Sequence, residues 1–435
     1  MTERTTNCRA PLGSRSRISS LSKSLTCTLI ALILAAGSGA PAACAQAPAP
    51  VLTLADALDL AASISPDIDA ADAQLRAATV ARRVAALRPN PSLNADFENV
   101  GGSRAYNDIE PPKQLVSVGL PFELGGKRSA RIALADAQGG RAQIERIATG
   151  AEVRLAITRA YVQAVAADRR LGTARDQAAI AAEALHAARI RVLAGRASPL
   201  EEQRAQVLRI SADAAADRAI RLAELARVDL GRRIGRPVTG TLDQPWFDRM
   251  DDFEPAQRDT NRTLAIATAT SDEKAAEAQL HLARSQRLPD VTLTAGVRRL
   301  PRNNEMAAVF GVSVPLPLFN NGTSLIALAS AERDRAAALR RAAEFDNEQA
   351  VGQAQADLAN AAADARTAAG PSLAAAQEAA RIARIGYREG KFGQLDLLEA
   401  ERTLAETRSG AIDALVAFHD ARAQLDRLTA SVPKD

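Results

Sequence analysis

The stretch that decides the fold is Val116-Ser-Val-Gly-Leu-Pro121, because it returns later in the chain as Val312-Ser-Val-Pro-Leu-Pro317. A second stretch, Gly195-Arg-Ala-Ser-Pro-Leu-Glu201, returns as Gly390-Lys-Phe-Gly-Gln-Leu-Asp396. Two recurrences at one spacing indicate an internal repeat of roughly 195 residues. Each half is predicted to run helix, strand, loop, strand, very long helix, tight turn and long helix.

The long helices follow from composition and periodicity. No proline occurs between Pro121 and Pro199, and the intervening sequence is rich in Ala, Arg, Glu and Gln. Apolar residues such as Ile144, Ile147 and Leu155 recur at steps of three and four, close to a coiled-coil seam. The predicted long helices cover residues 127–192, 199–234, 323–388 and 394–430, with a kink expected at Gly370-Pro371. The first would be roughly 100 Å long at ~1.5 Å per residue, so it must pack against other long helices.

Four short segments alternate apolar and polar residues, as β-strands with one apolar face do. The predicted strands cover residues 91–100, 113–122, 290–300 and 307–317. Each has about the length of a tilted transmembrane strand. Four strands cannot close a barrel, so one interpretation is a small sheet on a soluble helical protein. The other is that four strands from each of three chains close a barrel, with apolar residues toward lipid and polar residues toward a lumen.

The first 45 residues differ from the rest and are predicted to be a cleaved signal peptide. Five basic residues accompany an apolar run of about 12 residues, too short to span a bilayer as a helix, and small residues follow. All three cysteines (Cys8, Cys27, Cys44) lie here, and lipidation of Cys44 and a mis-assigned start both stay open. Residues 46–435 contain 50 basic and 50 acidic residues (55 − 5 and 51 − 1), so general basicity gives no support to nucleic-acid binding. The predicted domains after the leader are a first repeat over 46–235, a linker over 236–258 and a second repeat over 259–431.

Several ordered motifs resemble those of the TolC-like outer-membrane efflux family. They are Leu52-Thr-Leu-Ala-Asp-Ala-Leu58, Arg88-Pro-Asn-Pro-Ser with Phe97-Glu-Asn99, and Leu120-Pro-Phe-Glu-Leu-Gly-Gly-Lys-Arg128. The last two are similar to the branch that serves heavy-metal pumps of the cobalt–zinc–cadmium type. The resemblance implies a mainly α homotrimer with two structural repeats per chain. Its twelve-stranded β-barrel would lie in the outer membrane and continue as a long periplasmic α-helical barrel.

The resemblance also implies partners and site residues. Its function would be the exit duct of a tripartite, proton-driven efflux pump, working with a periplasmic adaptor and an inner-membrane resistance-nodulation-division pump. The two turns would be the tips that contact the adaptor, through Gly195, Arg196, Ala197, Ser198, Gly390, Lys391, Phe392 and Gly393. Tyr387 corresponds to a family tyrosine that holds the aperture shut by bonding an acid, which falls here at Glu201. The family's companion basic residue falls at Phe392, so that second link is missing.

Two further acids, Asp396 and Glu399, match the family segment that lines the closed aperture. Their i, i+3 spacing puts them on one helix face, and three chains would place six carboxylates around the opening. Rings of acids favour cations. The alternative is that acids in the first turn simply stabilise the positive end of the helix, and both readings can hold together.

No catalytic or cofactor motif stands out. His186, His281 and His419 are far apart in sequence and are expected to be ordinary helix residues, so neither a metal site nor a cofactor is predicted. The protein is expected to be a non-enzymatic duct, exporting divalent heavy-metal cations. The alternatives are a duct for drugs or small organic compounds, and a periplasmic coiled-coil scaffold or adaptor without a barrel.

Overall fold

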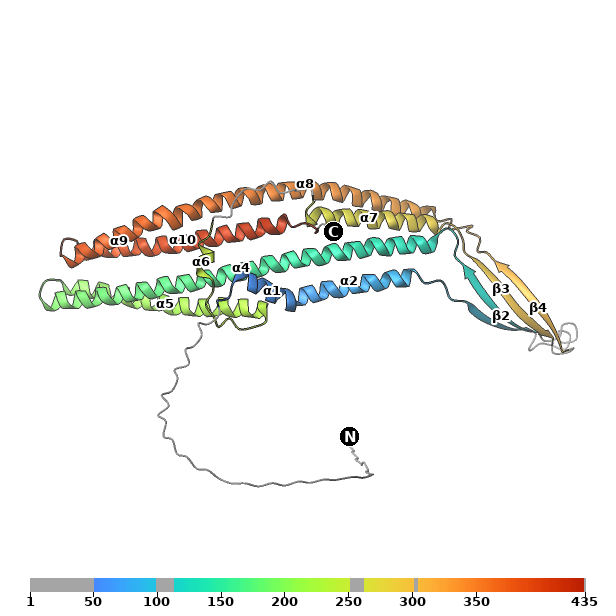
Figure 1. The fold of residues 1–435 in the computed structure, drawn as a ribbon, viewed down its shortest axis with the longest axis horizontal. Helices are drawn as coiled ribbons and strands as arrows, with labels where there is room; N and C mark the ends of the chain where they lie inside the picture. The colour runs from blue at the N-terminus through green and yellow to red at the C-terminus, as the bar shows by residue number, and fades with distance from the viewer. Residues whose placement is uncertain (1–50, 99–112, 251–261, 301–303, 434–435) are drawn as a thin grey trace, which may run out of the picture. The chain divides into compact units, whose positions relative to one another are not determined.

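A computed structural model describes residues 51–98, 113–250, 262–300 and 304–433 (Figure 1). The expected signal peptide over 1–45 lies outside the described residues, as does the loop after the first strand. The helices are α1 Leu54–Ile64, α2 Pro66–Ala85, α4 Lys127–Leu193, α5 Pro199–Ile234, α6 Gln244–Phe247, α7 Leu264–Ser285, α8 Thr323–Thr367, α9 Leu373–Arg388 and α10 Gln394–Leu428. The strands are β1 Ser92–Glu98, β2 Lys113–Phe122, β3 Val291–Leu300 and β4 Glu305–Ser313.

The two halves repeat in backbone detail as well as in element order. Gly126 precedes α4 and Gly322 precedes α8, and both adopt left-handed backbone angles, with φ of 70° and 78°. Glycine adopts this conformation without the steric cost that a Cβ brings. The 67-residue helix α4 packs on α2, α5, α7 and α10, so the longest element of the first half also contacts the second.

The four strands form one antiparallel sheet in the order β1-β2-β3-β4. The register aligns Leu93, Val118, Ala295 and Phe310 across the sheet, and these residues share one face. Their neighbours on the other face, Asn94, Ser117, Gly296 and Val309, are smaller or more polar. The alternation in the sequence therefore corresponds to one apolar face that runs over all four strands.

Two elements end differently from the predicted ranges. The strand predicted over 307–317 begins at Glu305 and ends at Ser313, because Pro315 and Pro317 have no backbone N–H to continue a ladder. The helix predicted over 323–388 is interrupted at the expected kink by one π-helical turn, Ala368–Ser372, where Gly370 has φ −97° and ψ −107°. Pro371 removes a helical hydrogen bond there, and α9 begins immediately afterwards.

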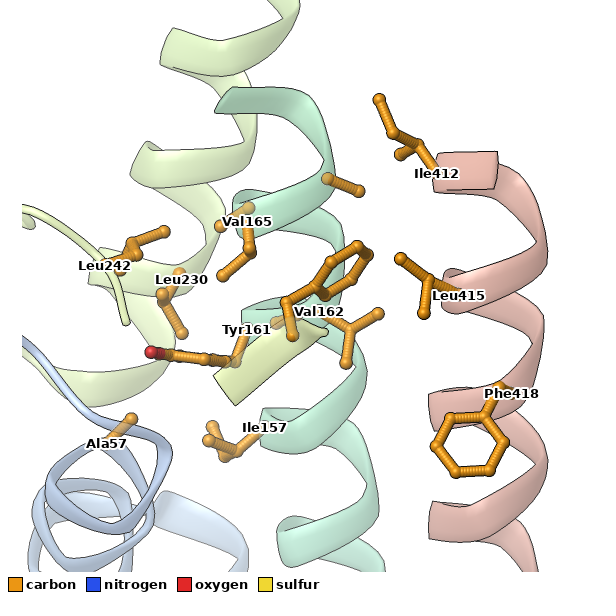
Figure 2. Close-up of a cluster of buried hydrophobic side chains, with 14 of the residues drawn as sticks. Ala57, Ile157, Tyr161, Val162, Val165, Leu230, Leu242, Ile412, Leu415 and Phe418 are labelled. Atoms are coloured by element: carbon orange, nitrogen blue, oxygen red, sulfur yellow. The ribbon is translucent and has the colours of Figure 1, made fainter. Parts of the chain in front are cut away.

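The main apolar core lies midway along α4, where the two halves meet. Figure 2 shows Tyr161, Val162 and Val165 of α4 between Leu230 of α5 and Phe418 of α10. Large side chains concentrate here, whereas alanines dominate the buried positions elsewhere along the long helices. The core therefore joins the hairpin of the first repeat to the last helix of the second.

The described part of the predicted linker, residues 236–250, packs into this core. Phe247 is fully buried, and Trp246 stacks on His419 of α10 with ring centroids 4.4 Å apart. Tyr161 of α4 donates a hydrogen bond to the Leu52 carbonyl at 2.8 Å and accepts one from the Asp243 amide at 3.0 Å. The segment thus packs against helices of both repeats as well as connecting the repeats in sequence.

Within the described residues, none of the helices is both long enough and apolar enough to cross a membrane.

Candidate functional site

The two turns predicted as tips have the same backbone structure, which we call the first turn (residues 194–198) and the second turn (389–393). Gly195 and Gly390 adopt left-handed angles, with φ of 66° and 74°. The Arg196 amide donates to the Arg191 carbonyl at 2.8 Å, and the Lys391 amide donates to the Gly386 carbonyl at 2.8 Å. This six-to-one hydrogen bond behind a left-handed glycine is the Schellman ending of a helix. Of the eight predicted tip residues, all are exposed except Ala197, which is half-buried.

The turns lie side by side at the end of the helices opposite the sheet (Figure 1). Gln394 Nε2 donates to the Glu201 carbonyl at 3.3 Å, and Tyr387 Oη donates to Glu201 Oε1 at 3.1 Å. The side-chain pair expected from the family resemblance is therefore in contact within one chain. It joins α9 of the second hairpin to α5 of the first.

Arg191 of α4 completes this contact, and the sequence reasoning missed it. Its Nη1 lies 3.4 Å from Glu201 Oε1, and its guanidinium carbon lies 5.0 Å from the centroid of the Tyr387 ring. We call Arg191, Glu201 and Tyr387 the tip cluster. A usable signal existed in the sequence, because Arg191 and Glu201 are each five residues from Arg196, and an antiparallel hairpin brings such positions opposite one another.

The protonation of Tyr387 suits its role as donor. Burial raises the pKa of the Tyr387 phenol above its ordinary value, while the neighbouring charge of Arg191 lowers it. The net shift is upward, so the phenol keeps its proton at neutral pH and donates to the Glu201 carboxylate.

The two predicted aperture acids lie on the exposed start of α10. Asp396 Oδ2 accepts a hydrogen bond from the Gly393 amide at 2.9 Å, so this acid satisfies an otherwise free N–H at the helix start. Glu399 is also exposed, one turn further on. In one chain, Asp396 thus has the structural role that the sequence analysis left open beside the aperture role.

Phe392 stands where the family carries a basic residue, and it packs back on its own hairpin. A Cβ built on Gly386 would lie 2.1 Å from the Phe392 ring, so the ring occupies the space that a side chain at position 386 would need. Because phenylalanine carries no charge, the second ionic link cannot form at this position.

A buried ion pair lies beneath the tip cluster. Glu401 of α10 is 4% exposed, and its carboxylate bonds both Nε and Nη2 of Arg384 on α9, the second at 2.8 Å. Arg191, Tyr387, Arg384 and Glu401 all line a groove of about 520 Å³ between α4 and the second hairpin. The tip cluster and the Gln394 contact join the two hairpins at the end of this groove.

Metal-ligating side chains do not gather anywhere in the described ranges: no group of three His, Cys, Asp or Glu residues has the geometry to hold an ion. Of the three histidines, His419 differs from the expected ordinary helix residue. It is buried, it stacks between aromatic rings, and its Nε2 donates to the Phe247 carbonyl at 2.9 Å.

Comparison with known proteins decides the family. The family model described as outer membrane efflux protein matches residues 57–236 and 257–431, one segment for each repeat. The chain belongs to the outer membrane efflux protein family. It is therefore an outer-membrane protein, and the resemblance drawn from its motifs is confirmed.

Relatives in the efflux family include two metal-resistance proteins. The cobalt-zinc-cadmium resistance protein CzcC of Cupriavidus metallidurans is 29% identical over 387 residues, which cover 87% of this chain and 90% of CzcC. The nickel-cobalt-cadmium resistance protein NccC of Alcaligenes xylosoxydans xylosoxydans is 30% identical over 265 residues, 59% of each chain. Among solved structures, the outer membrane protein VceC from Vibrio cholerae superimposes with a TM-score of 0.70 at 20% identity, covering 87% of this chain and 96% of VceC.

Proposed function

We propose that this efflux-family protein is the exit duct of a tripartite, proton-driven efflux pump that exports divalent heavy-metal cations. Its partners would be a periplasmic adaptor and an inner-membrane resistance-nodulation-division pump. The metal-resistance relatives support this cargo, because CzcC, whose name states resistance to cobalt, zinc and cadmium, aligns with 87% of this chain. The observation that carries the proposal is the apolar face of the sheet, since nothing in the described chain covers it.

This apolar face supports assembly of three chains into a barrel in the outer membrane. Phe310, Leu93 and Val312 are 82%, 73% and 69% exposed, an unusual state for large apolar side chains that share a face. The edge strands β1 and β4 run in opposite directions, because each of the three strand pairs is antiparallel. The β4 edge of one copy can therefore pair with the β1 edge of the next without changing the ladder type. Closure removes free backbone groups, as a bilayer requires.

The opposite end supports a gate at the turns. The tip cluster ties the two hairpins of one chain together, so opening requires that the Tyr387–Glu201 hydrogen bond break. Asp396 and Glu399 would line the closed aperture in three copies and attract cations. The exposed turn residues would meet the adaptor, which together with the pump would open the aperture.

Conductance of the purified protein in planar bilayers tests the aperture. With Asp396→Asn and Glu399→Gln combined, we expect block by Zn²⁺ or Co²⁺ on the turn side to need a several-fold higher concentration, because the ring of charge is gone. Glu406→Gln is the matched control, since Glu406 is an exposed acid on the same helix that pairs with Arg402. Unchanged divalent block in the double variant would remove these acids from the aperture.

The cargo is tested separately in cells. A strain that lacks the protein is expected to become sensitive to divalent heavy metals and to keep its resistance to drugs. The reverse pattern would favour the alternative duct for small organic compounds.

A further inference from the structure

The basic residue of the second turn, Lys391, pairs with Glu389 of the same turn and not with Glu201. The repeat pairs Arg191 with Gly386, Ala197 with Phe392, and Glu201 with Asp396, each at a spacing of 195. In the second turn the Phe392 ring fills the space beside Gly386. In the first turn the corresponding pair is reversed, with a long basic side chain at 191 and a small one at 197. The cation is thus on the other hairpin.

We propose that Arg191 is a positioning residue of the gate. Its guanidinium contacts the face of the Tyr387 ring while it pairs with Glu201, and in this way Arg191 holds the hairpins closed. The inference rests on the proposed closing role of Tyr387 and adds how that tyrosine is held. A guanidinium over an aromatic ring is a favourable cation–π contact, and here the same guanidinium is oriented by a carboxylate. The Arg191–Glu201 pair lies within the first hairpin, and the contact with Tyr387 carries the arginine across to the second.

Burial supports this assignment. The Tyr387 side chain is buried, that of Glu201 is 16% exposed and that of Arg191 is 36% exposed, so water can replace only part of the two contacts. By contrast, Arg189 pairs with Glu202 on the exposed side of the same hairpin, and no aromatic ring of the described residues contacts its guanidinium. Arg189 therefore provides a matched arginine that bonds within the first hairpin only.

The test is a double-mutant comparison by bilayer conductance of the purified full-length protein. Arg191→Gln should raise the mean open fraction about two- to fivefold, the factor that corresponds to a partly exposed cation–π contact. The same increase should appear in the Tyr387→Phe background, where the ring remains but the hydrogen bond to Glu201 is lost. In the Tyr387→Leu background, Arg191→Gln should add nothing. Arg189→Gln should leave the open fraction unchanged.

Three results would overturn the inference in distinguishable ways. If Tyr387→Leu opens the channel and Arg191→Gln does not, the gate stands and the role of Arg191 fails. If Arg191→Gln has its full effect in the Tyr387→Leu background, the arginine acts only on Glu201 and the ring contact is irrelevant. If neither Tyr387→Leu nor Glu201→Gln changes the conductance, the proposed gate itself fails. Should Arg191→Gln not assemble, Arg191→Met keeps the length of the side chain and carries the same comparison.

Discussion

Replacing Arg384 with alanine should loosen the second hairpin near its turn. Glu401 is 4% exposed and both of its oxygens bond the Arg384 guanidinium, so the variant would leave a buried carboxylate without its partner. Breaking a fully buried ion pair from one side costs about 3–5 kcal/mol. The Arg384 side chain is itself 41% exposed, so water can replace part of the contact. We therefore expect a cost below that range, about 2 kcal/mol per chain.

Hydrogen exchange in the purified assembly measures this cost locally. If the loss appears as local opening, amides on the facing turns of α9 and α10 should exchange ~30-fold faster, since each 1.36 kcal/mol is a factor of ten. Arg384→Ala combined with Glu401→Gln should restore most of the protection, because the uncompensated charge is gone. Wild-type exchange in Arg384→Ala, or a double variant no better protected than the single one, would show that this ion pair does not stabilise the second hairpin.

Two further predictions concern the core at the middle of α4. Burial lowers the pKa of His419 below its ordinary value of 6.5, against a hydrogen bond to the Phe247 carbonyl that raises it. Below pH 6.5 the unfolded chain therefore binds a proton at this histidine that the folded chain does not bind. Stability should be full above pH 6.5 and fall below it by at most about 1.4 kcal/mol per pH unit and chain. His419→Phe should flatten the dependence of Tm on pH between about 7.5 and 5.5, and an equally steep slope in this variant would contradict the prediction. Phe418 is fully buried, so Phe418→Ala should lower the free energy of unfolding in denaturant by about 3–5 kcal/mol per chain, and Phe418→Leu should lower it by less than half of that. Equal stability of the two variants would contradict this packing.

Local sequence rules accounted for the helices well, because proline placement and left-handed glycines act over a few residues. Proline at 199 begins α5, and the Schellman glycines at 195 and 390 end the helices before both turns. The same rules misplaced the end of β4, since alternation continued through Val314 and Leu316 whereas the intervening prolines ended the ladder. The alternation of apolar residues predicted a longer strand there, but the strand ends where the prolines cannot donate backbone hydrogen bonds.

Tertiary partners were less accessible from sequence. The Tyr387–Glu201 contact was expected only through the family resemblance, because the two residues are 186 positions apart. Arg191 and Arg384 looked like two among many surface arginines, and only the hairpin geometry distinguishes them. Likewise, Trp246 was assigned to a linker and His419 was expected to be an ordinary helix residue, whereas the two rings stack in the core. Composition identifies a side chain that can be buried, but it does not identify what buries it.

Three copies are proposed to close one barrel through their edge strands. Disulfide cross-linking in outer membranes tests this closure, because residues 46–435 contain no cysteine. Leu93→Cys in β1 would be combined, one at a time, with Ala308→Cys, Phe310→Cys or Val312→Cys in β4. We predict that at least one combination gives bands of two and three linked chains and none larger. Single chains in every combination, or a ladder that continues beyond three, would contradict the closed trimer.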